Sequence, residues 1–151
     1  KRVVFYPVKV LHRVLEFLVR IVHHVDIQAT IGPGFFIGHV GTIYIGPTVI
    51  GRNCSVHHNV TIGVGQSTEG YGVPVIGDDV WIGTGAVLYG KTVIGSRVTI
   101  ATGCQLSRSL PDECLAAGNP GRVVQLNYDN PAIRGGDLDP ARIPVALGRE
   151  P

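Results

Sequence analysis

The chain has 151 residues, a net charge of +2 and only 16% charged residues, which fits one domain large enough to bury a hydrophobic core. Its 44% apolar content excludes a disordered tail protein, and its small charge, with no basic stripe between aromatic residues, excludes nucleic acid as the expected partner. Glycine, with 21 residues, is about twice as frequent as its usual share of roughly 7%, which favours a fold with many tight turns.

The first predicted element is an amphipathic helix over residues 8–24. Its apolar residues recur at helical spacing from Leu11 to Val22, and its charged residues fall on the other face. Because the ends of a repeat protein need a cap, we expect this N-terminal segment, residues 1–25, to cover the open end of the repeat that follows. The basic polar face also suits a peripheral contact with a membrane, whereas the interrupting charges exclude a membrane span.

Residues 26–110 carry a repeat of six residues. Aliphatic side chains recur at Ile31, Ile37, Ile43, Ile50, Val56, Ile62, Ile76, Ile82, Leu88, Ile94, Ile100 and Leu106. A strand has period two and a helix has period 3.6, so a period of six requires another geometry. A three-sided β-solenoid meets this requirement, with one short strand and one corner in each repeat and the aliphatic side chain pointing inward. The repeats predict about four coils.

Two departures from the period predict features outside the wall of the solenoid. One extra residue between Ile43 and Ile50 predicts a bulge at the corner 45–47. Eight extra residues between Ile62 and Ile76 predict an excursion loop over 64–74, which is polar and rich in glycine. Loops that project from a rigid repeat are where binding residues tend to lie.

The three cysteines match neither a disulfide framework nor a C-x-x-C metal site. Cys54 and Cys104 occupy the small-residue position of the repeat, so we expect them to pack in the core. Free cysteines are typical of a reducing compartment, which predicts a cytoplasmic protein. Within residues 111–151, the segment to Val124 is expected to form an irregular strand or cap, and residues 127–151 a tail rich in proline and glycine. The chain begins at Lys1 and contains no Met, which leaves room for a preceding segment.

Three histidines lie within the predicted coils. His39 and His58 each follow an aliphatic position by two residues, so we expect them to stack on one edge of consecutive coils. Such imidazoles can form a general base with a polar neighbour, or part of a metal site. The alternative is a structural role at an edge or interface, which is the favoured interpretation for His57 and also for His58.

Several segments carry a more specific pattern. They are Val25-Asp26-Ile27, Ile37-Gly38-His39-Val40-Gly41-Thr42-Ile43, Val60-Thr61-Ile62-Gly63, Pro74-Val75-Ile76-Gly77, Trp81-Ile82-Gly83-Thr84-Gly85-Ala86 and Ala117-Gly118-Asn119-Pro120-Gly121-Arg122-Val123-Val124. Together they resemble the serine acetyltransferase group of the hexapeptide-repeat acyltransferases. The resemblance implies a left-handed parallel β-helix, a homotrimer with active sites between subunits, and acetyl-CoA as the donor.

The same resemblance implies roles for individual residues. His39 would take the proton from an acceptor hydroxyl, and Asp26 would be the carboxylate that holds the His39 imidazole. A positioned base typically contributes about 10²–10⁴-fold to such a reaction. Backbone N–H groups at the glycine-rich corner 63–65 are suited to stabilise the developing oxyanion. The cofactor-binding residues would be Gly63, Gly65, Thr84, Thr102 and Arg122.

The candidate acceptor-binding residues are His58, Gly38, Tyr71, Gly72 and Val73. In serine acetyltransferases an acid precedes the catalytic histidine and an Arg-His pair ends the loop, whereas this chain has Gly38 and Gly72-Val73. Because these changes remove charge-assisted contacts with an amino acid, we expect another small hydroxyl compound or a sugar as acceptor, with serine as the alternative. Further alternatives are a non-catalytic trimeric scaffold and a zinc site of the γ-carbonic anhydrase kind that uses His39 with His57 or His58. No metal cofactor is expected.

Overall fold

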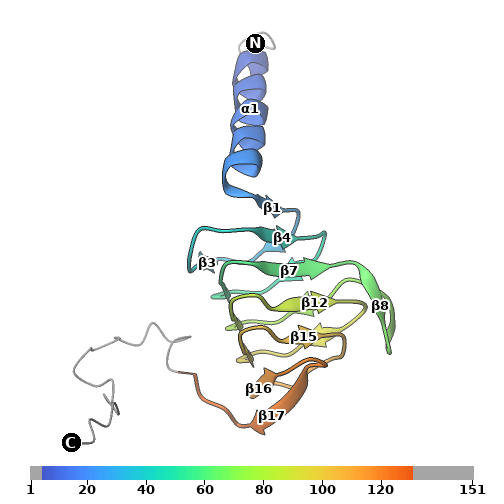
Figure 1. Ribbon diagram of the computed structural model, residues 1–151. Coiled ribbons are helices and arrows are strands. Elements are labelled where there is room, and N and C mark those ends of the chain that lie inside the picture. The colour runs from blue at the N-terminus through green and yellow to red at the C-terminus, as the bar shows by residue number, and fades with distance from the viewer. Residues whose placement is uncertain (1–4, 131–151) are drawn as a thin grey trace, which may run out of the picture.

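Three parallel β-sheets form the sides of a triangular prism (Figure 1). The computed structural model describes residues 5–130. The first sheet contains, in spatial order, β1 (Val25–Ile27), β4 (Ile43–Ile45), β7 (Val60–Gly63), β12 (Val87–Tyr89) and β15 (Gln105–Leu106). The second contains β2 (Thr30–Ile31), β5 (Val49–Ile50), β10 (Val75–Ile76) and β13 (Val93–Ile94). The third contains β3 (Phe36–Ile37), β6 (Ser55–Val56), β11 (Trp81–Ile82), β14 (Thr99–Ile100), β16 (Cys114–Ala117) and β17 (Arg122–Leu126).

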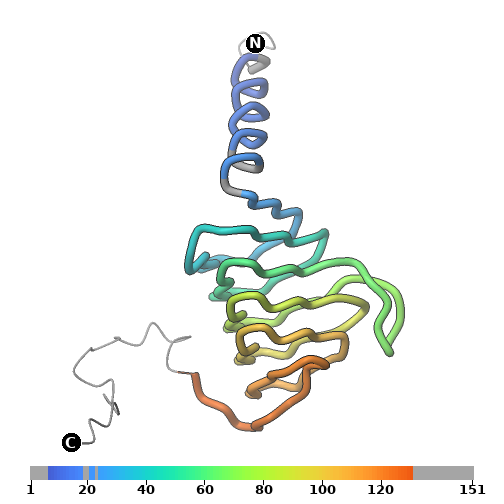
Figure 2. Tube along the Cα trace, in the orientation of Figure 1, coloured from blue at the N-terminus to red at the C-terminus, as the bar shows by residue number. Residues whose placement is uncertain are grey.

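The predicted β-solenoid is confirmed, and its coils wind in the left-handed sense (Figure 2). Each coil passes from the first sheet to the second and then to the third, and it pairs in parallel with the coils above and below. The structure has about five coils rather than four. The difference arises at the two ends, because β1 adds a strand above β4 and β16 adds one beyond β14.

The core is a column of aliphatic side chains inside the prism. In β13, Ile94 points inward and is 0% exposed, while its neighbour Val93 points outward and is 59% exposed. Burying one such side chain is worth roughly 1.5–3 kcal/mol, so the stacked coils stabilise one another chiefly through this column. Cys54, Cys104 and Cys114 are fully buried within it and form no disulfide. Burial raises the pKa of each thiol, which makes the cysteines poor nucleophiles.

The strand register shows that the first irregularity of the repeat lies at a different corner from the predicted one. Ile45, not Ile43, pairs with Ile62 of the next coil. Ile45 follows Ile37 by eight positions, whereas Ile62 follows Val56 by six. The predicted bulge at 45–47 is therefore wrong, because the extra residues lie in the corner 38–42.

Tight corners join the sheets, and residues with positive φ make the turns. On the edge between the third and first sheets, Asn59, Gly85 and Gly103 have φ values of 60°, 70° and 68°. Asparagine and glycine tolerate this left-handed region better than other residues, which explains their presence at these corners. We call this prism edge, formed by residues 38–42, 57–59, 83–86 and 101–104, the His39 edge.

The predicted excursion loop is an antiparallel hairpin of β8 (Gly65–Ser67) and β9 (Gly70–Gly72). Side-chain hydrogen bonds tie it to later coils. The Ser109 backbone N–H donates to the Glu69 carboxylate over 2.7 Å, and the Ser67 hydroxyl donates to the Lys91 carbonyl oxygen over 3.2 Å. The hairpin is therefore held against the prism at the edge between the first and second sheets.

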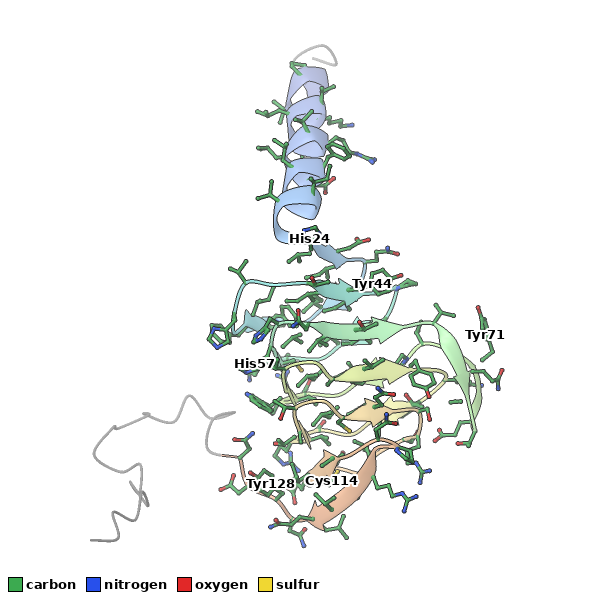
Figure 3. The ribbon with its side chains drawn as sticks, in the orientation of Figure 1. His24, Tyr44, His57, Tyr71, Cys114 and Tyr128 are labelled. Carbon is green, nitrogen blue, oxygen red and sulfur yellow. The ribbon has the colours of Figure 1, made fainter. Side chains whose placement is uncertain are left out.

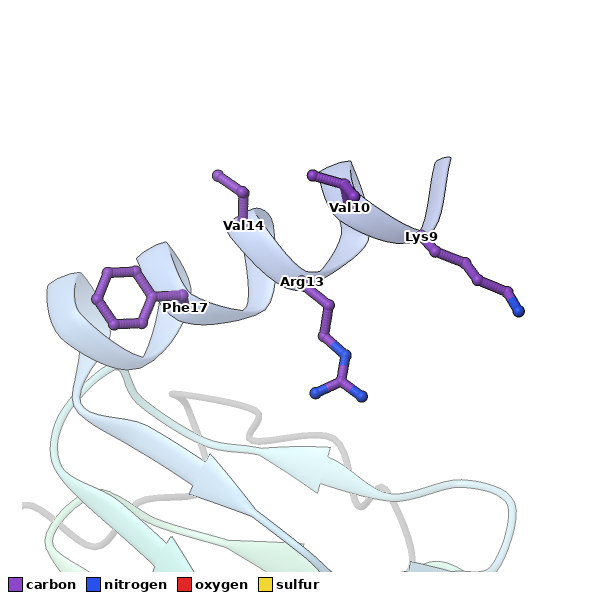
Figure 4. A pocket seen from close by; sticks show the side chains of 5 residues that line it. All are labelled: Lys9, Val10, Arg13, Val14 and Phe17. Carbon is purple, nitrogen blue, oxygen red and sulfur yellow. The ribbon is translucent and has the colours of Figure 1, made fainter. Parts of the chain in front are cut away.

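The helix α1 (Phe5–His23) projects from the end of the prism instead of covering it (Figure 1). The expected cap is wrong, because Ile37 of the first coil is still 36% exposed, and large apolar side chains of α1 are exposed as well. A hollow of about 310 Å³ runs along α1, lined by Lys9, Val10, Arg13, Val14 and Phe17 (Figure 4). Among the described residues, no helix is long and apolar enough to cross a membrane. A peripheral membrane contact stays a prediction.

The C-terminal segment forms two strands up to residue 126. β16 continues the third sheet, and β17 pairs with it in the antiparallel direction. The expected irregular strand corresponds to this pair, because its register shifts between Leu115 and Ala116. The rest of the predicted tail, residues 131–151, lies outside the described residues.

Candidate active site

His39 lies at the upper end of the His39 edge, between two histidines of the next coil. The centroid of its ring is 5.7 Å from that of His57 and 5.6 Å from that of His58. His39 is exposed, whereas His57 and His58 are half-buried. The structure therefore brings together three imidazoles, one from the corner after β3 and two from the corner after β6.

Two glycines on either side of His39 make room for this cluster. The Gly38 backbone N–H donates to the Val56 carbonyl oxygen over 2.9 Å, which sets Gly38 directly over His57. A Cβ at Gly38 would lie 2.8 Å from Nδ1 and Cε1 of His57, and one at Gly41 would lie 2.7 Å from Cβ of His58. Real Cβ atoms do not approach other atoms so closely, so the two rings require glycine at both positions.

Trp81 supports the cluster from the coil below. Its ring centroid is 4.7 Å from that of His57, with an angle of 56° between the ring planes. Burial lowers the pKa of His57, and positive charge on His39 and then on His58 lowers it further. A proton is therefore less stable on the His57 ring than on an ordinary histidine.

His58 presents a ring nitrogen that has no hydrogen-bond partner within the described part of the chain. Its Nδ1 is buried and makes no hydrogen bond there. Its backbone carbonyl oxygen accepts a hydrogen bond from the Gly85 N–H over 3.1 Å. The main chain of His58 is thus fixed, while one side of its ring is available to a group that reaches it.

Two of the predicted cofactor-binding residues continue down the same edge. Thr84 follows Ile82 by two positions as His58 follows Val56, and Thr102 follows Ile100 in the same way. The Gly103 N–H donates to the Thr84 carbonyl oxygen over 2.8 Å, which stacks these corners. The His39 edge therefore runs from three imidazoles to two small hydroxyl side chains.

The other predicted site residues lie elsewhere in the chain. Tyr71, 72% exposed on the hairpin, and His57 stand on opposite sides of the prism (Figure 3). Gly72 belongs to the same hairpin and Val73 follows it. Gly63 ends β7 and Gly65 begins β8, so the proposed oxyanion donors lie at the far end of the strand that follows His58. A single chain does not bring these residues to His39.

Asp26 and Arg122 are placed at the two ends of the prism. Asp26 lies in β1 opposite Tyr44 of β4, and its carboxylate accepts a hydrogen bond from the Gln28 amide over 3.4 Å. Arg122 is exposed at the start of β17. The role of Asp26 as the partner of His39 and the role of Arg122 in cofactor binding stay predictions.

Sequence reasoning missed the contributions of His57 and Trp81. A structural role at an edge or interface is the interpretation that the sequence favours for His57. The register places Gly38 above His57, since each follows its paired aliphatic residue, Ile37 or Val56, by one position. The signal available in the sequence was the pair of glycines around His39, whose missing side chains leave the space. Within residues 5–130, no group of three His, Cys, Asp or Glu side chains is arranged to hold a metal ion.

Comparison with known proteins identifies the class to which this fold belongs. Residues 74–108 match the family model described as bacterial transferase hexapeptide (six repeats). Together with the left-handed prism, this match defines a hexapeptide-repeat protein.

Within that class, the chain is similar to the serine acetyltransferases. It is 33% identical to the serine acetyltransferase of Synechococcus elongatus over 143 residues. The aligned region covers 93% of this chain and 57% of that protein. The crystal structure of the Neisseria gonorrhoeae serine acetyltransferase has a TM-score of 0.69 at 30% identity, over 85% of this chain and 51% of that one. A serine acetyltransferase in complex with CoA has a TM-score of 0.66 at 29% identity, over 77% and 48%. The chain thus spans about half the length of these relatives.

Proposed function

We propose that this chain is an acetyl-CoA-dependent O-acetyltransferase in which His39 is the general base. His39 would take the proton of an acceptor hydroxyl as the hydroxyl oxygen attacks the thioester carbonyl. The observation that carries this proposal is the His39 edge, where an exposed imidazole stands above a row of corners with small side chains. The similarity to serine acetyltransferases, one of them in complex with CoA, supports the same donor.

The row of corners below His39 suits the donor. The pantetheine arm of CoA is thin and largely neutral, so it would fit along an edge lined by small residues such as Thr84 and Thr102. Gly83 lies in the coil below His57, and its backbone N–H donates to the Ile100 carbonyl oxygen over 2.8 Å. A rigid edge of this kind would present the thioester to His39 at little cost in conformational entropy.

The proposal includes a homotrimer with sites between subunits. The hairpin with Tyr71, Gly72 and Val73 and the His39 edge stand on different edges of one prism, so one chain alone leaves the acceptor site incomplete. In a trimer of prisms, the hairpin of one copy would reach the His39 edge of its neighbour. The glycine-rich segment 63–65 would then supply oxyanion donors across the interface.

Two acceptors compete within this proposal. The names of the similar proteins favour L-serine. The sequence favours a different hydroxyl, because Gly38 and Gly72-Val73 stand where serine acetyltransferases carry charged or imidazole side chains. L-serine is therefore the first acceptor to test, and a sugar or other small alcohol is the second. The buried free cysteines are compatible with a cytoplasmic setting for either reaction.

The test is to incubate the purified full chain with acetyl-CoA and a panel of L-serine, sugars and small alcohols. The proposal predicts acceptor-dependent release of CoA and an acetylated product visible by mass spectrometry, and the accepted compound identifies the acceptor class. CoA binding without product from any acceptor would favour the non-catalytic scaffold. About one zinc ion per chain, by metal analysis, would favour the zinc enzyme instead.

A further inference from the structure

The imidazole cluster contains a pairing that the proposed catalytic role of His39 does not by itself require. The ring centroids of His39 and His58 are 5.6 Å apart, so one nitrogen of each ring comes close to hydrogen-bond distance where the two nitrogens point toward each other. The angle of 74° between their ring planes leaves an edge of one ring facing the other. The geometry permits a direct N–H to N contact.

The long corner and its glycines maintain this pairing. His39 reaches across to the next coil only because the corner 38–42 is longer than the corner after Val56. Gly41 lies over Cβ of His58, where any other side chain would push His58 away. The longer corner 38–42 and the missing side chain of Gly41 therefore both keep His58 next to His39.

The buried Nδ1 of His58 is the atom that lacks a partner. Buried polar atoms in native proteins are nearly always hydrogen-bonded, so a contact that supplies a donor to this Nδ1 would satisfy it. His57 is a poorer candidate for that contact, because its ring is packed against that of Trp81 and its burial lowers its pKa, which disfavours the charged donor. His39 is the described side chain that faces His58 and that changes its protonation during the proposed reaction.

We propose that His58 is a positioning residue for His39, and that its Nδ1 accepts a hydrogen bond from the His39 imidazolium. This inference rests on the proposed function. The acceptor O–H bond breaks, and its proton goes to one ring nitrogen of His39. The other His39 nitrogen, already protonated, donates to Nδ1 of neutral His58, which takes the place that the resemblance assigns to Asp26. When the thioester C–S bond breaks, His39 returns the proton to the sulfur of CoA.

The test compares His58→Leu with His58→Asn in the full chain. Leucine fills the space without an acceptor, whereas the Asn amide oxygen stands close to the position of Nδ1 and can still accept. With acetyl-CoA and L-serine, His58→Leu is expected to lower kcat by about ten- to a hundredfold, as for the loss of a hydrogen bond to a charged group. The KM for acetyl-CoA should stay unchanged, and His58→Asn should recover most of the loss.

An NMR titration of the His39 ring, without substrate, separates this inference from the proposed function. Loss of the acceptor disfavours the charged ring, so the pKa of His39 should fall in His58→Leu and stay near the wild-type value in His58→Asn. Gly41→Ala, which displaces His58 without changing it, should act like His58→Leu. Equal His39 titration in all four proteins would overturn the pairing. A fall in the His39 pKa without any acetyl transfer would support the pairing and contradict the proposed reaction with serine.

Discussion

The upper and lower corners of the His39 edge stack on the same prism edge, but they differ in length and in the side chains they carry. The lower corners, 83–86 and 101–104, keep the six-residue period, bury Ala86 and Cys104, and carry small side chains outside. The upper corner, 38–42, is longer and places His39 above His57 and His58. The regular corners form an edge with small side chains outside, and the irregular corner adds a titratable group at its end. The proposed function therefore depends on the corner where the repeat is broken.

The largest effect is expected from a variant in which the upper corner has the regular length. Deleting Val40 and Gly41 gives the corner the same length as the corner after Val56. Acetyl transfer should fall by about 10²–10⁴-fold, because His39 no longer reaches its position. The melting temperature should stay the same or rise, since the shorter corner matches the coil below. A deletion variant that folds and keeps its activity would show that the longer corner has no part in catalysis.

The regular part of the prism can be tested by a matched pair in one strand. Ile94→Ala removes a fully buried side chain from the core, and should lower the free energy of unfolding by about 2–5 kcal/mol. Val93→Ala changes an outward side chain in the same strand, and should stay within about 0.5 kcal/mol. Denaturant unfolding measures both. Similar losses for the two variants would contradict the inward column of aliphatic residues.

A smaller change at the upper corner tests the fit between coils. Gly38→Ala places a Cβ against the His57 ring, and should lower kcat by about ten- to a hundredfold through displacement of the cluster. Gly46→Ala is the control, because its Cβ would meet no atom closer than the Ile62 carbonyl oxygen at 3.4 Å. Unchanged kcat in Gly38→Ala would mean that the position of His57 does not matter.

The smallest expected effect concerns pH. The pKa of His57 is lower in the folded chain than its ordinary value of about 6.5, so the unfolded chain binds more protons as the pH falls through that value. Acid therefore destabilises the fold through His57, and the effect levels off below the folded pKa. His57→Gln should show a smaller drop in melting temperature than the wild type between about pH 7.5 and 5.5. An equal drop in both proteins would contradict the lowered pKa.

The sequence was sufficient to predict the fold wherever the period of six held. Each inward position from Ile50 to Leu106 is buried, because a buried aliphatic side chain every six residues has few other geometries available to it. The predicted strand register was wrong at Ile43, because Ile45 and not Ile43 pairs with Ile62. Ile43 and Ile45 are both aliphatic and both buried, so the sequence alone cannot choose between them. The prediction that the N-terminal helix covers the end of the prism was wrong, because an apolar helix face does not indicate which surface it packs against.

The site was predictable only in part. His39 and His58 could be placed on one edge, since both follow an aliphatic position by two residues. The separation of Tyr71 from His57 could not be predicted, because it depends on which corner the hairpin leaves. His57 and Trp81 lie in consecutive coils that are separated in the sequence by an eight-residue insertion. Their contact therefore could not be predicted from the number of residues between them.

The measurement that tests the central claim most directly is acceptor-dependent release of CoA from acetyl-CoA by the wild type, His39→Ala and His12→Ala. His12 is an exposed histidine of α1 and serves as the matched control. We predict that His39→Ala loses about 10²–10⁴-fold in kcat at an unchanged melting temperature, and that His12→Ala retains full activity. Equal rates in all three proteins would show that the irregular corner of the His39 edge is not the catalytic site.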